Sequence, residues 1–266
     1  MASQARVEFR FYEELNYFLP ASRRKRDFWS VISDNATVKH AIEALGVPHT
    51  EVDLVLVNGQ SVGFSRRLED GDRVSVYPLF ECFDISTLRR LGGNPLRRTR
   101  FVADAHLGAL ARYLRMLGFD TLFRNDYHDQ QLVSISLAER RILLTKDRAL
   151  LMRKALLHAL YVRAIRPREQ LAELLARLDL YHSTKPFTRC MICNTPLQLI
   201  AKKAARSRLP PKLGVSHGRF FACGGCERLY WEGSHFRRMQ SFVQSLLSVA
   251  ERSLSGTIDG HARPNA

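Results

Sequence analysis

The sequence of 266 residues predicts an α+β fold followed by an α/β fold, and it ends in a small cysteine-bearing module. Three observations support this prediction. Strand patterns dominate the first third of the chain, strands and helices then alternate, and two C-x-x-C pairs follow. The apolar share of 45% and the charged share of 25% are ordinary for a globular protein, and they exclude a wholly disordered chain.

Residues 1–83 are predicted to form the first module. Apolar and polar residues alternate over Val7–Phe11, which is typical of a half-buried strand. A short helix is expected after Asn35 or Thr37, and further strands lie within residues 52–78. This order is that of a β-grasp fold. The last stretch resembles a ubiquitin-like sulfur carrier, but the two terminal glycines that a carrier needs are missing after it, which argues against that function.

Charge divides the chain into two parts. Residues 1–86 carry 10 basic and 13 acidic side chains, whereas residues 87–266 carry 31 basic and 13 acidic ones, a net charge of +18. Such a basic part predicts a polyanionic partner, and nucleic acid is the usual one. An anionic membrane surface is the weaker alternative, which only the amphipathic helix after Ser234 approaches. Residues 84–100 are rich in arginine and are predicted to be a basic linker.

We expect a cytoplasmic protein with no membrane segment. No stretch approaches the roughly 18 to 20 uninterrupted apolar residues that a spanning helix needs. The N-terminus leads directly into a strand pattern and has no apolar core of a secretion signal.

Residues 101–182 are predicted to alternate between strand and helix. Buried strands are expected at residues 101–103 and 142–145, and helices at residues 107–117 and 129–141. This rhythm is typical of a parallel sheet that is flanked by helices.

Residues 183–252 are predicted to be a zinc ribbon with a terminal helix, and residues 253–266 a disordered tail. Four thiolates in two C-x-x-C pairs complete a tetrahedral shell and leave no open position, so the zinc is expected to be structural. Reduced cysteines without a metal, or a catalytic zinc, are the alternatives. The expected ligands are Cys190, Cys193, Cys223 and Cys226.

Carboxylates are expected at the carboxyl ends of the parallel strands, where ligands bind in open α/β sheets. Asp104 and Asp147 follow two buried strands, and Asp126 and Asp129 lie before the second helix. Carboxylates that converge repel each other unless a cation lies between them, and oxygen ligands suit Mg²⁺ or Mn²⁺. Such ions serve phosphodiester hydrolysis by activating water and stabilising the leaving oxygen. The alternatives are a helix cap for Asp129 and a turn former for Asp126.

Basic and aromatic side chains are the candidate contacts for RNA. The candidate phosphate-binding residues are Arg97, Arg98, Arg112, Arg115, Lys146, Lys202 and Lys203. The candidate base-stacking residues are Phe220, Phe221, Tyr230 and Trp231. A solvated linker is the alternative for the first two arginines, and packing inside the module is favoured for Phe221 and Tyr230.

Four runs of sequence carry a more specific resemblance: FVAD at 101–104, LGALARYLRMLGFD at 107–120, ILLTKDR at 142–148 and YWEGSH at 230–235. Together with the cysteine pairs, they resemble the Mut-seven C-terminal RNase family, a branch of the PIN-like nucleases. The first module resembles the ubiquitin-like domain that is often fused to this family. The resemblance implies a metal-dependent endoribonuclease with Mg²⁺ or Mn²⁺ on its aspartates.

The chain departs from the family pattern at two places. Ala149 stands where the family often has an acidic residue, and Gln130 and Gln131 stand where acidic residues are common. These departures leave an alternative open: a non-catalytic RNA-binding adaptor, whose ubiquitin-like domain recruits a protein partner. The sequence assigns no task to Ser234 and His235 within the fourth run.

Overall fold

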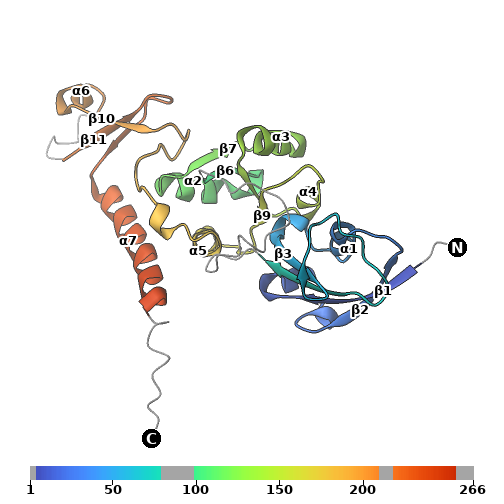
Figure 1. Ribbon diagram of the computed structural model, residues 1–266. Helices are drawn as coiled ribbons and strands as arrows, with labels where there is room; N and C mark the ends of the chain where they lie inside the picture. Colours follow the sequence, from blue (N-terminus) through green and yellow to red (C-terminus); the bar gives the residue numbers. More distant parts are fainter. Residues whose placement is uncertain (1–3, 79–98, 210–217, 256–266) are drawn as a thin grey trace, which may run out of the picture. The chain divides into compact units, whose positions relative to one another are not determined.

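The computed structural model describes residues 4–78, 99–209 and 218–255 (Figure 1). The chain divides into two compact units, one of residues 1–106 and 124–163 and the other of residues 107–123 and 164–266. The predicted linker up to residue 98, with Arg97 and Arg98, lies outside the described residues, and so does the predicted tail from residue 256.

The first unit begins with the five-stranded β-grasp sheet that the sequence predicts. Its strands are β1 (Gln4–Phe11), β2 (Phe28–Ser33), β3 (Val52–Val57), β4 (Gln60–Ser61) and β5 (Arg73–Pro78). They lie in the order β2-β1-β5-β3-β4, with β1 and β5 parallel and the other neighbours antiparallel. Helix α1 (Val38–Ala44) begins after Thr37, whose hydroxyl accepts the N–H of His40 at 3.2 Å. The buried face of α1 shares one core with β1, β3 and β5.

Three short 3-10 helices complete this part of the unit. They are η1 (Glu13–Phe18), η2 (Ala21–Arg23) and η3 (His49–Glu51). The first of them replaces the hairpin that a direct β1–β2 connection would make, and it buries Leu15 and Phe18 in the β-grasp core.

A parallel sheet forms the rest of the first unit. Strand β6 (Arg100–Ala103) pairs with β8 (Ile142–Thr145), and β8 pairs with β9 (Ala159–Tyr161). Every side chain from Phe101 to Ala103 and throughout β8 is buried, as in a sheet that is covered on both faces. Helix α3 (Asp129–Glu139) packs against β6 and β8. The predicted α/β order is confirmed.

Contacts within this unit join the β-grasp part to the start of helix α4 (Arg148–Leu151). The guanidinium carbon of Arg148 lies 5.3 Å from the ring centre of Tyr17, 5.2 Å from that of Phe18 and 5.6 Å from that of Tyr161. Tyr17 and Phe18 belong to η1, whereas Tyr161 belongs to β9. The backbone N–H of Tyr161 also donates to the carboxylate of Glu51 in η3. Aromatic and polar contacts therefore both cross between the two sheets.

The described part of the second unit combines the α-helices α2, α5, α6 and α7 with a small antiparallel sheet. Its elements are α2 (Gly108–Met116), β7 (Asp120–Phe123), α5 (Pro167–Arg177), η5 (Tyr181–Ser183), β10 (Leu197–Ile200), α6 (Lys202–Arg206), β11 (Phe220–Cys223), β12 (Leu229–Trp231) and α7 (Ser234–Ser255), with η4 (Ala105–Leu107) just before α2. Helix α2 packs against β7 and α5, and the small sheet has the order β10-β11-β12. Helix α7, the terminal helix that the sequence predicts for this module, begins at Ser234. No helix in the described ranges is both long and apolar enough to cross a membrane.

Gly118 fixes the turn at which α2 ends. Its φ is +92°, and a Cβ at this position would lie 2.2 Å from the carbonyl oxygen of Lys185. The N–H of Lys185 donates to the carbonyl of Leu117 at 2.8 Å, and the N–H of Phe187 donates to that of Met116 at 2.8 Å. The segment that leads into the first cysteine pair is therefore held directly against the end of α2.

We expect Gly118→Ala to lower the free energy of unfolding by more than about 2 kcal/mol, because the positive φ and the nearby carbonyl both oppose a Cβ. Gly59→Ala is the matched control, since Gly59 has a φ of +81° but no atom within 4 Å of a Cβ. The control should lose only the backbone cost of about 1 to 2 kcal/mol. Urea or thermal unfolding of both variants measures the difference, and equal losses would contradict the close approach at Lys185.

Candidate functional site

The carboxyl ends of β6 and β8 bring two of the predicted aspartates onto one buried hydroxyl. Thr145, the last residue of β8, donates from its Oγ1 to Oδ2 of Asp104 at 2.7 Å. The same Oγ1 accepts the backbone N–H of Asp147 at 2.9 Å. Asp104 also continues the ladder between the strands, because its N–H donates to the carbonyl of Leu144 at 3.0 Å. Thr145 therefore links the two acidic positions.

Both carboxylates accept hydrogen bonds, but each keeps lone pairs that could bind a cation. Asp147 is the N-cap of α4, and its Oδ1 accepts the N–H of Ala149 at 2.7 Å. Oδ1 of Asp104 accepts the N–H of Ala105. Asp147 is exposed and Asp104 is half-buried. Oxygen ligands of this kind suit a hard divalent ion.

Asp126 and Asp129 are engaged with arginines at the surface of the same unit. Asp126 pairs with Arg124 at 2.6 Å, and Asp129 pairs with Arg153 at 3.3 Å. The hydrogen bond from Arg124 is the main reason that the pKa of Asp126 lies below its usual value. The N-cap of α3 is His128 rather than Asp129, so the capping alternative for Asp129 is not what the structure shows.

Among the described residues, only the four cysteines form a group of three or more potential metal ligands within 4.8 Å of one another. Asp104 and Asp147 thus both contact Thr145, but no three carboxylates among the described residues lie within 4.8 Å of one another.

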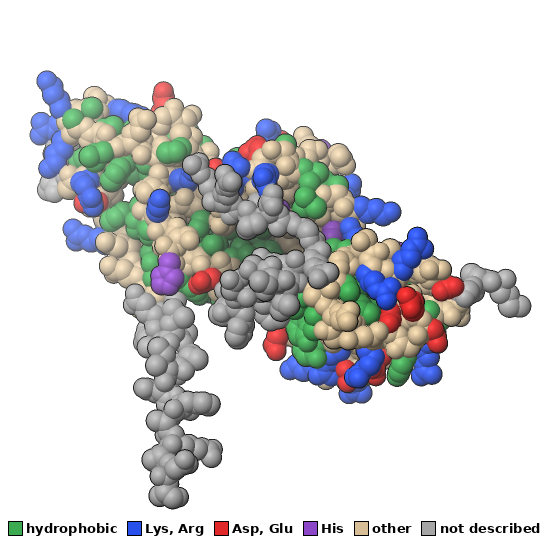
Figure 2. Space-filling view, viewed as in Figure 1, with side chains coloured by type: hydrophobic (Ala, Val, Ile, Leu, Met, Phe, Trp, Pro, Cys, Tyr) green, Lys and Arg blue, Asp and Glu red, His purple; other side chains and the backbone are tan. Residues whose placement is uncertain are grey.

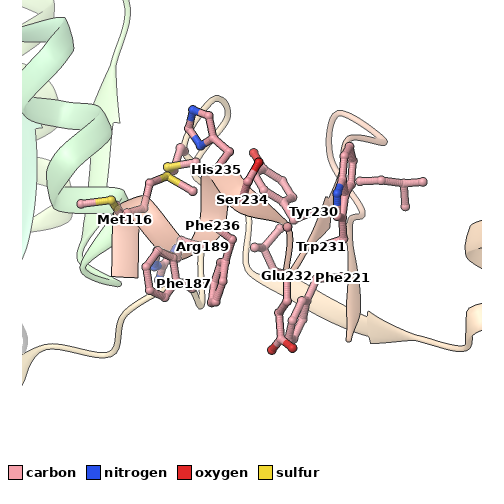
Figure 3. Close-up of a pocket in the computed structure, with 15 residues that line it drawn as sticks. Met116, Phe187, Arg189, Phe221, Tyr230, Trp231, Glu232, Ser234, His235 and Phe236 are labelled. Atoms are coloured by element: carbon pink, nitrogen blue, oxygen red, sulfur yellow. The ribbon is translucent and has the colours of Figure 1, made fainter. Parts of the chain in front are cut away.

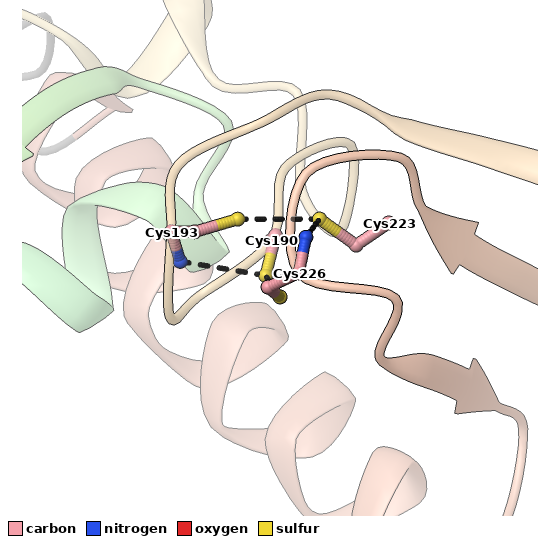
Figure 4. A group of neighbouring side chains, drawn as sticks. All are labelled: Cys190, Cys193, Cys223 and Cys226. Carbon is pink, nitrogen blue, oxygen red and sulfur yellow. Dashed lines mark hydrogen bonds between the residues drawn. The ribbon is translucent and has the colours of Figure 1, made fainter.

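The four predicted cysteines meet in one cluster of the second unit (Figure 4). The Sγ atoms of Cys193 and Cys223 lie 3.2 Å apart, and those of Cys190 and Cys226 lie 3.6 Å apart. Two backbone N–H groups, those of Gly225 and Cys226, point at the sulfur of Cys223, each at 3.4 Å. Such N–H groups stabilise thiolates, so the cluster is suited to a structural metal such as zinc.

Glycine is required at the second knuckle. A Cβ on Gly225 would lie 2.4 Å from the hydroxyl of Thr195. Thr195 lies next to the first cysteine pair and accepts from Cys193 at 3.4 Å. The absence of a Cβ at Gly225 therefore lets the two knuckles approach each other closely.

The cluster cannot easily carry four negative charges by itself. Burial, followed by the neighbouring sulfurs, raises the pKa of Cys226 to about 12. Burial acts in the same direction on Cys193, but hydrogen bonds to Thr195 and to the neighbouring thiols outweigh it and lower the pKa of Cys193 to about 6. A divalent cation would allow all four groups to ionise, and its binding would release protons.

Arg115 differs from the expectation that it holds a phosphate. It is only 3% exposed, and burial is the main reason that its pKa lies below the usual value. Its Nε donates to the carbonyl of Thr121 at 2.9 Å, and a terminal nitrogen donates to the carbonyl of Ile192 at 2.6 Å. Its guanidinium is therefore occupied in holding the first cysteine knuckle to α2 and β7.

Asn194 reinforces the same connection. Its side chain accepts the N–H of Thr121 at 3.0 Å and donates to Asp120 at 2.7 Å. Sequence reasoning missed both Thr145 and Asn194. For Thr145, a hydroxyl at the end of an otherwise apolar strand was an available signal. Asn194 gave no signal beyond its place after a cysteine pair.

The remaining predicted basic residues that the structure describes are accessible. Arg112, Lys202 and Lys203 are exposed, whereas Lys146, between Thr145 and Asp147, is half-buried. Lys and Arg side chains gather around α6 and the cysteine-bearing sheet (Figure 2). This distribution agrees with a polyanionic partner for the second unit.

The fold and these sites define a β-grasp domain followed by a parallel-sheet domain with terminal aspartates and a four-cysteine ribbon. The family model described as Mut7-C RNAse domain matches residues 99–243, and the model described as Mut7-C ubiquitin matches residues 4–84. The chain belongs to the Mut7-C RNase family, and the predicted resemblance is confirmed.

No curated protein matches the chain significantly. One solved structure that does match is the solution structure of the Haloferax volcanii HVO 2177 protein, which is 25% identical. The match covers 30% of this chain and 88% of that one, with a TM-score of 0.26. A superposition this poor supports no conclusion about the present chain.

We expect Arg115→Met to lower the free energy of unfolding by about 2 to 4 kcal/mol, because it leaves buried carbonyls without a donor. Arg112→Met, on the exposed side of the same helix, is the matched control and should change the free energy of unfolding by no more than about 0.5 kcal/mol. Thermal unfolding of both variants measures this difference in the free energy of unfolding. A stable Arg115→Met variant would show that the buried contacts are not needed for stability.

Proposed function

We propose that this protein is a metal-dependent endoribonuclease that hydrolyses RNA phosphodiester bonds. The observation that carries the proposal is the connection of Asp104 and Asp147 through the hydroxyl of Thr145, at the carboxyl ends of two parallel strands. Ligands bind at this edge in open α/β sheets. The chain's membership of the Mut7-C RNase family supports the same reaction class.

The residues present at this edge fit Mg²⁺ or Mn²⁺. Asp104 and Asp147 would hold the ion, and Asp129 would contribute once its exposed pair with Arg153 opens, since such pairs are weak. Asp126 plays a smaller part in this proposal because both of its oxygens accept from Arg124. When bound, such an ion would supply positive charge for the leaving oxygen and would lower the pKa of a water molecule. Thr145 acts as a positioning residue by fixing the orientation of the Asp104 carboxylate.

Basic side chains of the chain would bind the RNA backbone. The proposed residues are Arg112, Lys146, Lys202 and Lys203, with Arg97 and Arg98 of the linker. Arg115 is left out because its guanidinium is buried and occupied. Backbone binding of this kind depends steeply on salt, since each phosphate contact releases counterions.

The cysteine cluster would hold a structural zinc ion, because four thiolates leave no coordination site for a substrate. Thiols that lie together without disulfides are typical of a reducing compartment, so we propose a cytoplasmic location. The ubiquitin-like domain would bind a protein partner. Its edge strand β2 exposes Trp29 (45%) and Val31 (61%), side chains of the kind found at interfaces.

We expect Asp104→Asn and Asp147→Asn each to reduce cleavage of end-labelled total RNA at least about 100-fold, because each removes a charged metal ligand. Cleavage should need Mn²⁺ or Mg²⁺, while RNA binding should remain. Asp126→Asn is the matched control and should keep most of the activity.

Intact RNA under every metal condition, with salt-sensitive binding, would contradict the nuclease and support the adaptor. Cleavage that survives both substitutions and excess EDTA would place the reaction at another site or in a contaminant.

Removal of the structural metal should destabilise the second unit. We expect one zinc ion per chain by elemental analysis, and a fall of about 10 °C or more in the thermal midpoint after chelation, because a closed zinc site contributes directly to folding. Cys223→Ser should lose the ion and show the same low midpoint. Cys82→Ser, which changes the cysteine outside the two pairs, should keep it. A metal-free chain with an unchanged midpoint would overturn the assignment.

A further inference from the structure

A cavity of about 360 Å³ lies between the cysteine-bearing sheet and the start of α7 (Figure 3). Phe187 and Phe236 lie on one side of it, and Phe221 and Tyr230 lie on the other. All four side chains are half-buried rather than enclosed. A mostly apolar cavity of this size is typical of a small-molecule or side-group pocket.

The rings are arranged around open space rather than packed into a closed core. The ring centres of Phe187 and Phe236 lie 4.7 Å apart at an interplanar angle of 53°. Phe221 and Tyr230 are directly paired residues in the register of β11 and β12. Aromatic side chains from both sides therefore line the cavity, and its volume could hold a flat group.

A polar hollow adjoins this cavity and shares four residues with it, among them Glu232 and Ser234. Arg219 and Arg237 line the hollow, and both are exposed. Arg219 is held by Glu232 at 2.7 Å, whereas Arg237 lies on the first turn of α7. Residues 185–238 carry 11 basic and 2 acidic side chains. The apolar cavity thus lies directly beside a hollow that is lined by two exposed arginines.

We propose that this cavity binds an unpaired nucleobase of a bound RNA strand, and that Arg219 and Arg237 bind the adjoining phosphates. Aromatic rings stack on any base, and arginines neutralise the backbone. The inference rests on the proposed function in one respect, that RNA is the bound polymer. It gives Ser234 and His235 a place, since both line the cavity.

This assignment changes the part that the aromatic residues play. Phe221 and Tyr230 are expected from sequence to pack within their module, and their direct cross-strand pairing agrees with that. The base-contacting residue is Phe236, which comes from α7 and was not among the four stacking candidates. An apolar peptide would not need the basic hollow, so the charge favours RNA over a protein segment.

The test is fluorescence anisotropy of the full zinc-loaded chain without added Mg²⁺ or Mn²⁺. The probes are a labelled single-stranded RNA of about eight nucleotides and a labelled abasic oligomer of equal length and charge. We expect the native chain to bind the base-bearing probe about 10-fold more tightly. Phe236→Leu keeps the apolar volume but removes the π face, and it should abolish this preference. Phe236→Tyr should retain it.

Two controls separate stacking from charge and from folding. Leu199→Ala changes a side chain of β10 that is 65% exposed and does not line the cavity, and it should leave both affinities unchanged. Arg237→Gln should weaken both probes equally. Phe187→Leu replaces Phe236→Leu if the latter loses zinc or its native thermal midpoint.

Equal affinity of the native chain for both probes would overturn the proposal, and so would a preference that survives loss of the ring. Either result would favour an apolar protein segment as the occupant. Failure of the nuclease proposal is distinguishable from failure of this one. If RNA is never cleaved but the base preference is present and depends on Phe236, the cavity proposal is supported and only the nuclease proposal is contradicted.

Discussion

The burial of two parallel strands is the constraint on which the candidate active site depends. Strands β6 and β8 are covered on both faces, so polar side chains are tolerated only where the strands end. Parallel pairing places both carboxyl ends at one edge of the sheet. Asp104 and Asp147 therefore meet there, and the buried hydroxyl of Thr145 satisfies one group from each. A change of register between the strands would separate the pair.

Much of the architecture could be predicted because it depends on local pattern. Apolar periodicity predicted the β-grasp strands and the helix at residues 129–141, and the two C-x-x-C pairs predicted the cysteine cluster. Whether an individual charged side chain is buried or exposed could not be predicted in the same way. Arg112 and Arg115 lie three residues apart on one helix, yet the first is exposed and the second is buried. One acceptor of Arg115, the carbonyl of Ile192, lies 77 residues away in the sequence.

The same reasoning explains why the role of the ubiquitin-like domain was not evident from sequence. Its contact with the parallel sheet brings Tyr17 and Phe18 against Arg148 and Tyr161, which lie more than 100 residues later in the chain. Each exposed cation–π contact contributes about 0.5 to 1 kcal/mol, so the contacts matter as a group. Arg148 directly follows Asp147, the N-cap of α4. The β-grasp domain therefore supports the helix whose first turn is capped by a proposed metal ligand.

The cysteine cluster connects several elements of the second unit. Its first knuckle is bound to α2 and β7 by Arg115 and Asn194, and the segment before it is held at Gly118. Its second knuckle leads through β12 into α7, which is anchored by the ring of Phe242 against Tyr113 and Arg168. A metal bound by the four cysteines would thus connect the contacts of the first knuckle to those of the second. The aromatic cavity lies in the same module, and a metal on the four cysteines would stabilise its surroundings although none of the cysteines lines it.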